Sequence, residues 1–149
     1  MSYQNIVYMD NNATTRVAPE VVEAMLPYLT DFYGNPSSMH NFGGQVGGAV
    51  KKAREQVAEL IGADAEEIVF TSCGTESDST ALLSALHTYP DKRHIVTTRV
   101  EHPAIKSLCE NLEHITGHKY SVTRLKVDDQ GNLDIEEYKK ALTDETAIV

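Results

Sequence analysis

The sequence has few cysteines and no block of positive charge. Its two cysteines, Cys73 and Cys109, form neither a disulfide framework nor a metal-binding spacing. Lysine and arginine total 13 against 22 aspartates and glutamates, which gives a formal net charge of −9. The absence of clustered cations argues against non-specific binding to nucleic acid or to anionic lipid.

Two kinds of segment are also missing. No apolar run is long enough to cross a bilayer, and residues 1–5 lack the basic start of a secretory signal. With 149 residues, 41% of them hydrophobic, the chain has the length of one ordinary domain and the material for a core. Together these features predict a soluble protein of a reducing compartment, the cytoplasm.

Short apolar strands alternate with amphipathic helices along the chain. Strands are predicted at residues 6–9, 68–70, 94–98, 120–127 and from 146 onward. Helices are predicted from Pro19, over 46–61 up to a cap at Gly62, over 80–86, from Pro103 up to Gly117, and over 134–142 behind a capping box of Asp134 and Glu137. This alternation is typical of an α/β fold whose mostly parallel sheet is flanked by helices.

The stretch 68–82 joins a predicted buried strand to a helix through the turn Ser72-Cys73-Gly74-Thr75. Glycine allows close approach of a ligand, and the first turn of a helix offers N–H groups that favour an anion. Hydroxyl groups at Ser72, Thr75 and Ser77 add further donors. The stretch lacks a Walker lysine and the dinucleotide glycine spacing. It therefore predicts either a phosphate cup or a plain strand–turn–helix connection.

Ligands of parallel sheets bind beyond the carboxyl ends of the strands. Gly74 and Thr75 follow one predicted strand end and His102 follows the next, so we expect them to line one crevice. Residues 10–15 (DNNATT) form a polar stretch of turn formers. This stretch is either a surface loop or a binding loop.

Four segments resemble the cysteine desulfurases of the NifS/IscS type, closest to the nitrogen-fixation branch. They are residues 8–15 (YMDNNATT), 34–40 (GNPSSMH), 71–78 (TSCGTESD) and 101–104 (EHPA). The resemblance implies the N-terminal portion of a class V, fold-type-I enzyme dependent on pyridoxal phosphate. It also implies that residues 18–149 belong to the large, cofactor-binding domain, that residues 1–17 associate with the small domain, and that the sheet is incomplete because the chain is truncated.

The resemblance implies a reaction and partners as well. L-cysteine is converted to L-alanine on pyridoxal 5′-phosphate, and an enzyme cysteine takes the sulfur as a persulfide. A scaffold protein of the NifU/IscU type then accepts the sulfur for iron–sulfur cluster assembly, in a nitrogenase context. The family also implies a homodimer. Metal enters only through these clusters, since we expect no metal-ligand site in the chain itself.

By motif match, Gly74 and Thr75 hold the cofactor phosphate and His102 stacks on the pyridine ring and assists proton transfer. Asn12, Ala13 and Thr14 are expected near the substrate. The family's cofactor-bearing lysine and persulfide cysteine have no counterpart in the chain, where Cys73 and Cys109 are expected to be structural. The 149 residues alone are therefore expected to be inactive.

Two alternatives stay open at this point. One is another class V enzyme, such as a selenocysteine lyase or an aminotransferase. The other is a non-catalytic module that binds a ligand or a partner. An incomplete sheet argues against this module, because it leaves an unpaired strand edge and exposed apolar helix faces.

Overall fold

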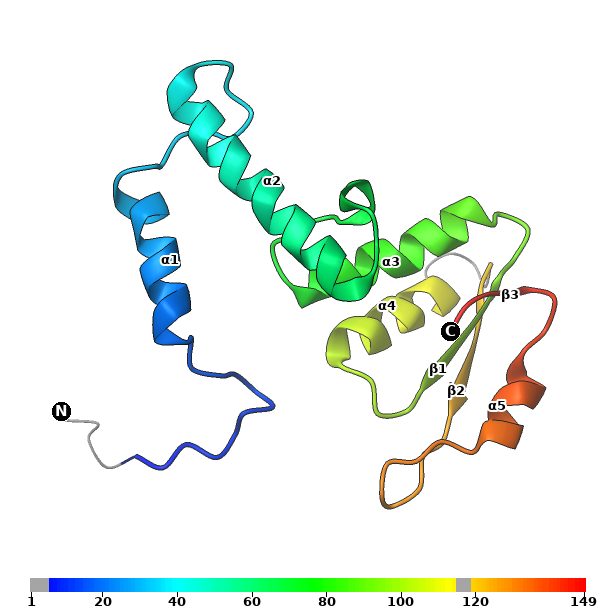
Figure 1. Ribbon diagram of the computed structural model, residues 1–149. Coiled ribbons are helices and arrows are strands. Elements are labelled where there is room, and N and C mark those ends of the chain that lie inside the picture. The colour runs from blue at the N-terminus through cyan, green and yellow to red at the C-terminus, as the bar shows by residue number, and fades with distance from the viewer. Residues whose placement is uncertain (1–5, 115–118) are drawn as a thin grey trace. The chain divides into compact units, whose positions relative to one another are not determined.

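The computed structural model describes residues 6–114 and 119–149, which divide into two units, Met1–Val69 and Phe70–Val149 (Figure 1). The first unit contains α1 (Pro19–Thr30), α2 (Asn41–Ile61) and the 3-10 helix η1 (Ala65–Glu67). The second contains α3 (Gly74–Thr88), β1 (His94–Thr98), α4 (Pro103–His114), β2 (Ser121–Leu125), α5 (Ile135–Ala141) and β3 (Thr146–Ile148). The predicted domain boundary after residue 17 stays a prediction.

Helix α2 of the first unit has well-defined ends. Its N-cap is His40, whose ring Nδ1 accepts a hydrogen bond from the Gly43 amide at 3.2 Å. A Cβ atom at Gly43 would lie 2.4 Å from the Asn35 carbonyl oxygen, so the close packing of this turn requires glycine. The helix ends at Gly62, whose φ of 70° lies in the left-handed region. The predicted glycine cap is confirmed.

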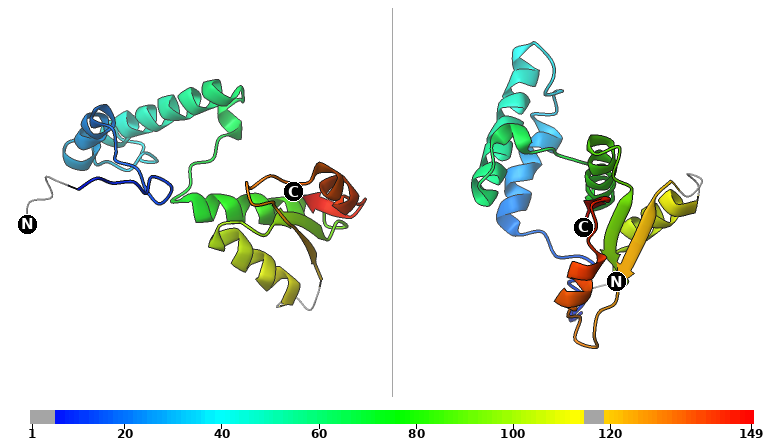
Figure 2. Two further views of the ribbon diagram at one scale, coloured as in Figure 1. Left: turned by 90° about the horizontal axis from the view of Figure 1, so that it is seen from below. Right: turned by 90° about the vertical axis from the view of Figure 1, so that its right-hand side faces the viewer.

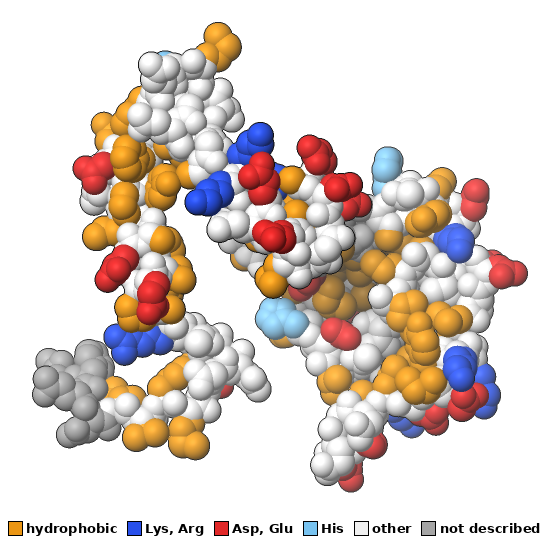
Figure 3. All heavy atoms as spheres, viewed as in Figure 1, with side chains coloured by type: hydrophobic (Ala, Val, Ile, Leu, Met, Phe, Trp, Pro, Cys, Tyr) orange, Lys and Arg blue, Asp and Glu red, His pale blue; other side chains and the backbone are white. Residues whose placement is uncertain are grey.

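The first unit leaves most of its apolar side chains exposed. Helix α1 buries none of its residues, and α2 buries Gly43 and Ala58. Figure 3 shows hydrophobic side chains along α1 on the face in view. Leu29 of this helix is 72% exposed. Among the described residues, no helix combines the length and apolarity that a bilayer crossing needs.

The second unit is built on a three-stranded parallel sheet of order β2-β1-β3. His94 to Thr98 pair in register with Ser121 to Leu125, and the shorter β3 pairs with the start of β1. Helix α4 connects β1 to β2, and α5 connects β2 to β3 (Figure 1). The predicted α/β class with a parallel sheet is confirmed.

Successive residues of β1 are buried on both faces of the sheet. Ile95 and Val96 are both buried and point to opposite faces of the sheet, as successive strand residues must. Ile95 belongs to a cluster with four side chains of α3 and α4, namely Leu82, Leu86, Cys109 and Leu112. Helices α3 and α4 accordingly contact each other beside the sheet (Figure 2).

Two predicted strands are wrong. Residues 6–9 and 68–70 are not in strand conformation, because neither has a neighbouring strand to supply backbone hydrogen bonds in the described part of the chain. Helix α3 begins at Gly74, six residues before the predicted 80–86 segment, because residues 74–79 continue directly from the turn. The Gly117 end of α4 lies outside the described residues.

The remaining boundaries agree with the sequence pattern. Pro103 opens α4, and β1 and β3 lie where they were predicted. Strand β2 is shorter than predicted because Val127 leaves the sheet for an isolated antiparallel bridge with Leu133. The Asp134 side chain caps α5 by accepting from the amides of Glu136 and Glu137.

Candidate functional site

The predicted cup is the N-terminus of α3, where Cys73 is the N-cap residue. The first amides of a helix have no intrahelical backbone acceptor, so the Gly74 N–H is available to an anion, whereas the Thr75 N–H also hydrogen-bonds to Cys73 and helps to lower the pKa of its thiol. The Ser72 donors are used within the protein. The Glu76 carboxylate oxygen Oε2 accepts from the Ser72 amide at 2.7 Å and from its hydroxyl at 2.6 Å.

Hydrogen bonds to Ser72 stabilise the Glu76 carboxylate. The Ser72 hydroxyl and then its amide lower the pKa of Glu76. The sequence predicts Ser72 as a donor to a ligand, but the Glu76 carboxylate, one helical turn later, accepts from both the amide and the hydroxyl of Ser72. The sequence does contain a signal for this contact: Glu76 is the third residue of α3, and a glutamate at that position often accepts hydrogen bonds from residues before the helix.

The two other predicted hydroxyl donors differ in their surroundings. Ser77 Oγ lies 2.6 Å from Thr71 Oγ1 and 3.3 Å from the Cys73 carbonyl oxygen, so it fastens the turn. In residues 6–114 and 119–149, the Thr75 hydroxyl makes no hydrogen bond. Thr75 is therefore the hydroxyl of this turn that is left for a ligand.

The two cysteines have opposite environments. Cys73 is exposed, and the Glu76 amide together with the Ser72 hydroxyl lowers the pKa of its thiol. Cys109 is completely buried in the α3–α4–β1 cluster, and burial raises the pKa of its thiol. The packing role predicted for Cys109 is confirmed, whereas Cys73 is a solvent-facing thiol at a helix N-terminus.

His102 lies between the end of β1 and the start of α4. Its side chain is exposed, and its Nδ1 accepts a hydrogen bond from the Ala104 amide at 3.1 Å. The His102 carbonyl accepts the first backbone bond of α4 from Ile105 at 3.0 Å. His102 thus caps α4, which follows from the proline after it, because the residue before proline is held in an extended conformation.

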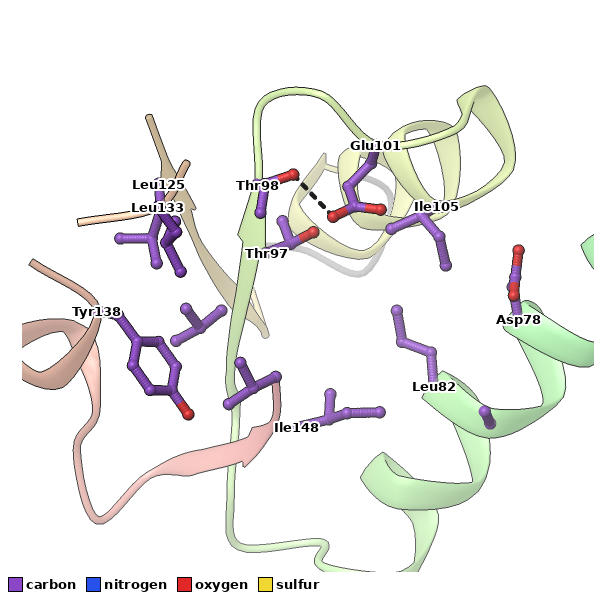
Figure 4. Close-up of a pocket in the computed structure, with 13 residues that line it drawn as sticks. Asp78, Leu82, Thr97, Thr98, Glu101, Ile105, Leu125, Leu133, Tyr138 and Ile148 are labelled. Carbon is purple, nitrogen blue, oxygen red and sulfur yellow. Dashed lines mark hydrogen bonds between the residues drawn. The ribbon is translucent and has the colours of Figure 1, made fainter. Parts of the chain in front are cut away.

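A cavity of about 280 Å³ lies at the carboxyl ends of the three strands, between α3, α4 and α5 (Figure 4). Its walls are mainly apolar and include Leu82, Val96 and Ile148. Asp78 from the first turns of α3 and Glu101 from the segment before α4 add two half-buried carboxyl groups. Gly74, Thr75 and His102, which were expected to line one crevice, do not line this cavity. The lining residues that come nearest to them along the chain are Asp78 and Glu101.

The proposed substrate residues belong to the first unit. Asn12, Ala13 and Thr14 are exposed and lie in a turn closed by the Ala13 amide on the Asp10 carbonyl at 3.1 Å. Their role stays a prediction. In the described part of the chain, no three His, Cys, Asp or Glu side chains form a group that holds a metal ion.

The parallel sheet, the helix N-terminus of α3 and the histidine after β1 agree with the class of protein that the comparisons give. The chain belongs to the aminotransferase class-V family, whose model matches residues 7–149. Within that family it is similar to a cysteine desulfurase of Trichormus azollae, 60% identical over 145 residues, and to the cysteine desulfurase NifS of Azotobacter vinelandii, 56% identical over 144 residues. The resemblance to NifS-type cysteine desulfurases is confirmed.

These alignments cover 97% and 96% of this chain but 36% and 35% of the relatives, so the chain spans just over a third of their length. Solved structures agree with the sequence matches. A NifS-like protein aligns with a TM-score of 0.86 at 40% identity, covering 94% of this chain and 38% of that one. SspA in complex with cysteine aligns with a TM-score of 0.84 at 34% identity, covering 93% and 40%.

Proposed function

We propose that this chain is the N-terminal third of a pyridoxal-phosphate-dependent cysteine desulfurase of the NifS type. The reaction converts L-cysteine to L-alanine and leaves the sulfur on an enzyme cysteine as a persulfide. The observation that carries this proposal is the cavity at the carboxyl ends of the strands, lined by Asp78 of α3 and by Glu101, the residue before His102, in a class-V chain.

The residues present fit the cofactor's phosphate group. The amides of Gly74 and Thr75 and the unused Thr75 hydroxyl are donors on one turn. A Cβ atom at Gly74 would meet no other atom within 4 Å, so there is open space for a bulky anion beside the backbone. These residues would hold the phosphate, and the bound cofactor would supply an electron sink for the substrate carbon.

His102 would act through one nitrogen. Because the Ala104 amide donates to Nδ1, the neutral ring carries its proton on Nε2. Nε2 is therefore the atom that can exchange a proton with a ligand.

The partners follow from the same proposal. The whole protein would act as a homodimer in the cytoplasm and would pass its sulfur to an iron–sulfur scaffold protein of the NifU/IscU type, in support of nitrogenase. The exposed, unpaired thiol of Cys73 suits a reducing compartment. Residues Asn12, Ala13 and Thr14 would contact the substrate.

A chimera tests the proposed activity. Residues 7–149 replace the matching segment of the Trichormus azollae cysteine desulfurase, which supplies the remaining length. We expect release of L-alanine from L-cysteine and formation of a protein persulfide, whereas the 149 residues alone release none. A folded chimera that binds pyridoxal phosphate but yields no alanine, or that prefers selenocysteine or transamination, would overturn the proposal.

Substitutions at the cup test the cofactor site in that chimera. Thr75→Val removes the hydroxyl and keeps the shape, and we expect pyridoxal phosphate to bind about ten- to one-hundred-fold more weakly, as for one lost hydrogen bond to a charged group. Thr75→Ser should retain most of the affinity. Thr80→Val makes the same change at an exposed position farther along α3 and should leave affinity unchanged.

A further inference from the structure

The segment between β1 and α4 is fixed by side chains that the proposed reaction does not use. Thr98 is the last residue of β1. Its hydroxyl donates to Glu101 Oε1 at 2.8 Å and accepts from the Val100 amide at 3.3 Å. One hydroxyl therefore closes the turn that leads to His102, as a donor to Glu101 and as an acceptor from Val100.

The start of this turn is anchored to the sheet. The Arg99 amide donates to the Leu125 carbonyl at 3.0 Å, which extends the β1–β2 pairing by one residue beyond Thr98. Glu101 is half-buried and lines the cavity, and Figure 4 shows its carboxyl group directed back toward the end of β1. The Thr98–Glu101 bond thus ties the residue before His102 to a rigid strand.

His102 is held from its other side by α4. Pro103 restricts the backbone of His102, and the Ala104 amide holds its Nδ1. The ring keeps this position only while residues 101 and 102 stay in place, because an N-cap residue has to present its acceptor to the first turn of the helix. Glu101 is the residue that joins this cap to the strand.

We propose that Glu101, through its hydrogen bond with Thr98, is the positioning residue that fixes the ring orientation and tautomer of His102. This inference rests on the proposed function for its catalytic meaning, because His102 matters to the reaction only if it exchanges a proton there. The positioning of His102 by Glu101 does not depend on the proposed function, because the hydrogen bonds that hold His102 form within the chain without any ligand.

The ring nitrogens of His102 report on this arrangement directly. In the full 149-residue chain, labelled with nitrogen-15 at histidine, NMR distinguishes a protonated from an unprotonated ring nitrogen. The signal of His102 is identified by its loss in His102→Asn, which retains a side-chain acceptor for the cap. We expect the unsubstituted chain to show Nε2 protonated and Nδ1 unprotonated.

Two pairs of variants then remove or retain the bond. Thr98→Val and Glu101→Ala remove it, and the His102 nitrogen shifts should move toward those of free histidine, which exchanges between both tautomers. Thr98→Ser and Glu101→Gln retain a donor and an acceptor and should resemble the unsubstituted chain. The double variant Thr98→Val/Glu101→Ala should shift no further than Thr98→Val alone, because that substitution already removes the bond to Glu101 together with the bond from the Val100 amide.

Thr97→Val is the matched control. Thr97 precedes Thr98, lines the same cavity and makes no side-chain hydrogen bond in residues 6–114 and 119–149. Its substitution should leave the His102 shifts unchanged. Unchanged shifts in folded Glu101→Ala, or a shift in Thr97→Val as large as in Thr98→Val, would overturn the proposal, as would protonated Nδ1 in the unsubstituted chain.

The active chimera supplies the second readout. Thr98→Val and Glu101→Ala should lower kcat by on the order of ten-fold, a modest loss for a displaced catalytic group, with a smaller change in KM for cysteine. Thr98→Ser and Glu101→Gln should retain kcat. An inactive chimera refutes the proposed function alone, because the NMR shifts are measured without cofactor and still decide the role of Glu101.

Discussion

Cys109→Ser probes the junction of α3, α4 and β1. The Cys109 side chain is completely buried beside Leu82, Leu86 and Ile95. Burial of a hydroxyl among apolar side chains costs about 1–3 kcal/mol when no partner is available. A serine inside a helix can bond to the carbonyl four residues earlier, here Ile105, which offsets part of that cost. We therefore expect a loss of about 1–2 kcal/mol in the free energy of unfolding.

Two further variants separate polarity from lost volume. Cys109→Ala removes one buried heavy atom and should cost roughly 1 kcal/mol. Cys73→Ser makes the same chemical change at an exposed position and should stay within about 0.5 kcal/mol of the unsubstituted chain.

Urea unfolding followed by far-ultraviolet circular dichroism measures all three variants. With a slope of about 2 kcal/mol per molar urea, Cys109→Ser should lower the transition midpoint of the second unit by about 0.5–1 M. Equal midpoints for Cys109→Ser and Cys73→Ser would refute the reasoning. That result would mean that the helices do not enclose residue 109.

Three other predictions concern thiols, ion pairs and a helix end. A thiol reagent should label Cys73 rapidly in the folded chain, because the Cys73 thiol is exposed and its pKa is lowered. The same reagent should label the buried Cys109 only after denaturant is added. Mass spectrometry measures the extent of labelling at each cysteine. The pKa of Glu113 is lowered mainly by the hydrogen bond from Arg124, at 2.7 Å, so its stabilising contribution is present above the carboxyl's usual pKa and is lost as pH falls through the lowered value. Urea midpoints across acidic pH should therefore fall less steeply in Glu113→Gln. Gly62→Ala should destabilise α2 by about 1–2 kcal/mol, the cost of a left-handed conformation for a residue with a Cβ atom, as measured by thermal unfolding.

The predictions for Glu113 and for Gly62 each have a matched control variant. Glu55→Gln removes one partner of an exposed ion pair with Lys51 at 3.8 Å and should leave the pH dependence of the midpoint nearly unchanged. Gly48→Ala replaces a glycine inside α2 whose added Cβ would meet no atom within 4 Å, so it should stabilise the helix. A stabilising Gly62→Ala, equal labelling of both thiols in the folded chain, or equal pH slopes for both glutamine variants would contradict the respective prediction.

The sequence predicts elements well where the signal is local. Pro103 at the start of α4, Gly62 at the end of α2 and the cap of Asp134 depend on backbone geometry within a few residues. The strands predicted at 6–9 and 68–70 fail for the opposite reason. A strand exists only with a neighbour, and β-branched composition cannot supply one.

In the candidate site, too, the sequence predicts the features that depend on local signals and not those that depend on side-chain contacts. The position of His102 after a strand and before a proline indicated its place at the sheet edge. Its bond to Ala104, and the closure of the preceding turn by Thr98, depend on side-chain orientations that spacing does not determine. The contact between Glu76 and Ser72 is another example. Ser72 has two donors next to the predicted anion site, but the Glu76 carboxylate of α3 accepts from both of them.

The buried His94 couples the three strands in a way that bears on the order of folding. Its Nε2 lies 2.8 Å from the Thr123 hydroxyl, 29 positions along the chain, and its Nδ1 lies 2.9 Å from that of Thr146, 52 positions along. Closing the shorter loop costs less chain entropy, so β1 and β2 should associate through α4 first. The hydrogen bond between His94 Nδ1 and Thr146 should then form last, when β3 completes the three-stranded sheet.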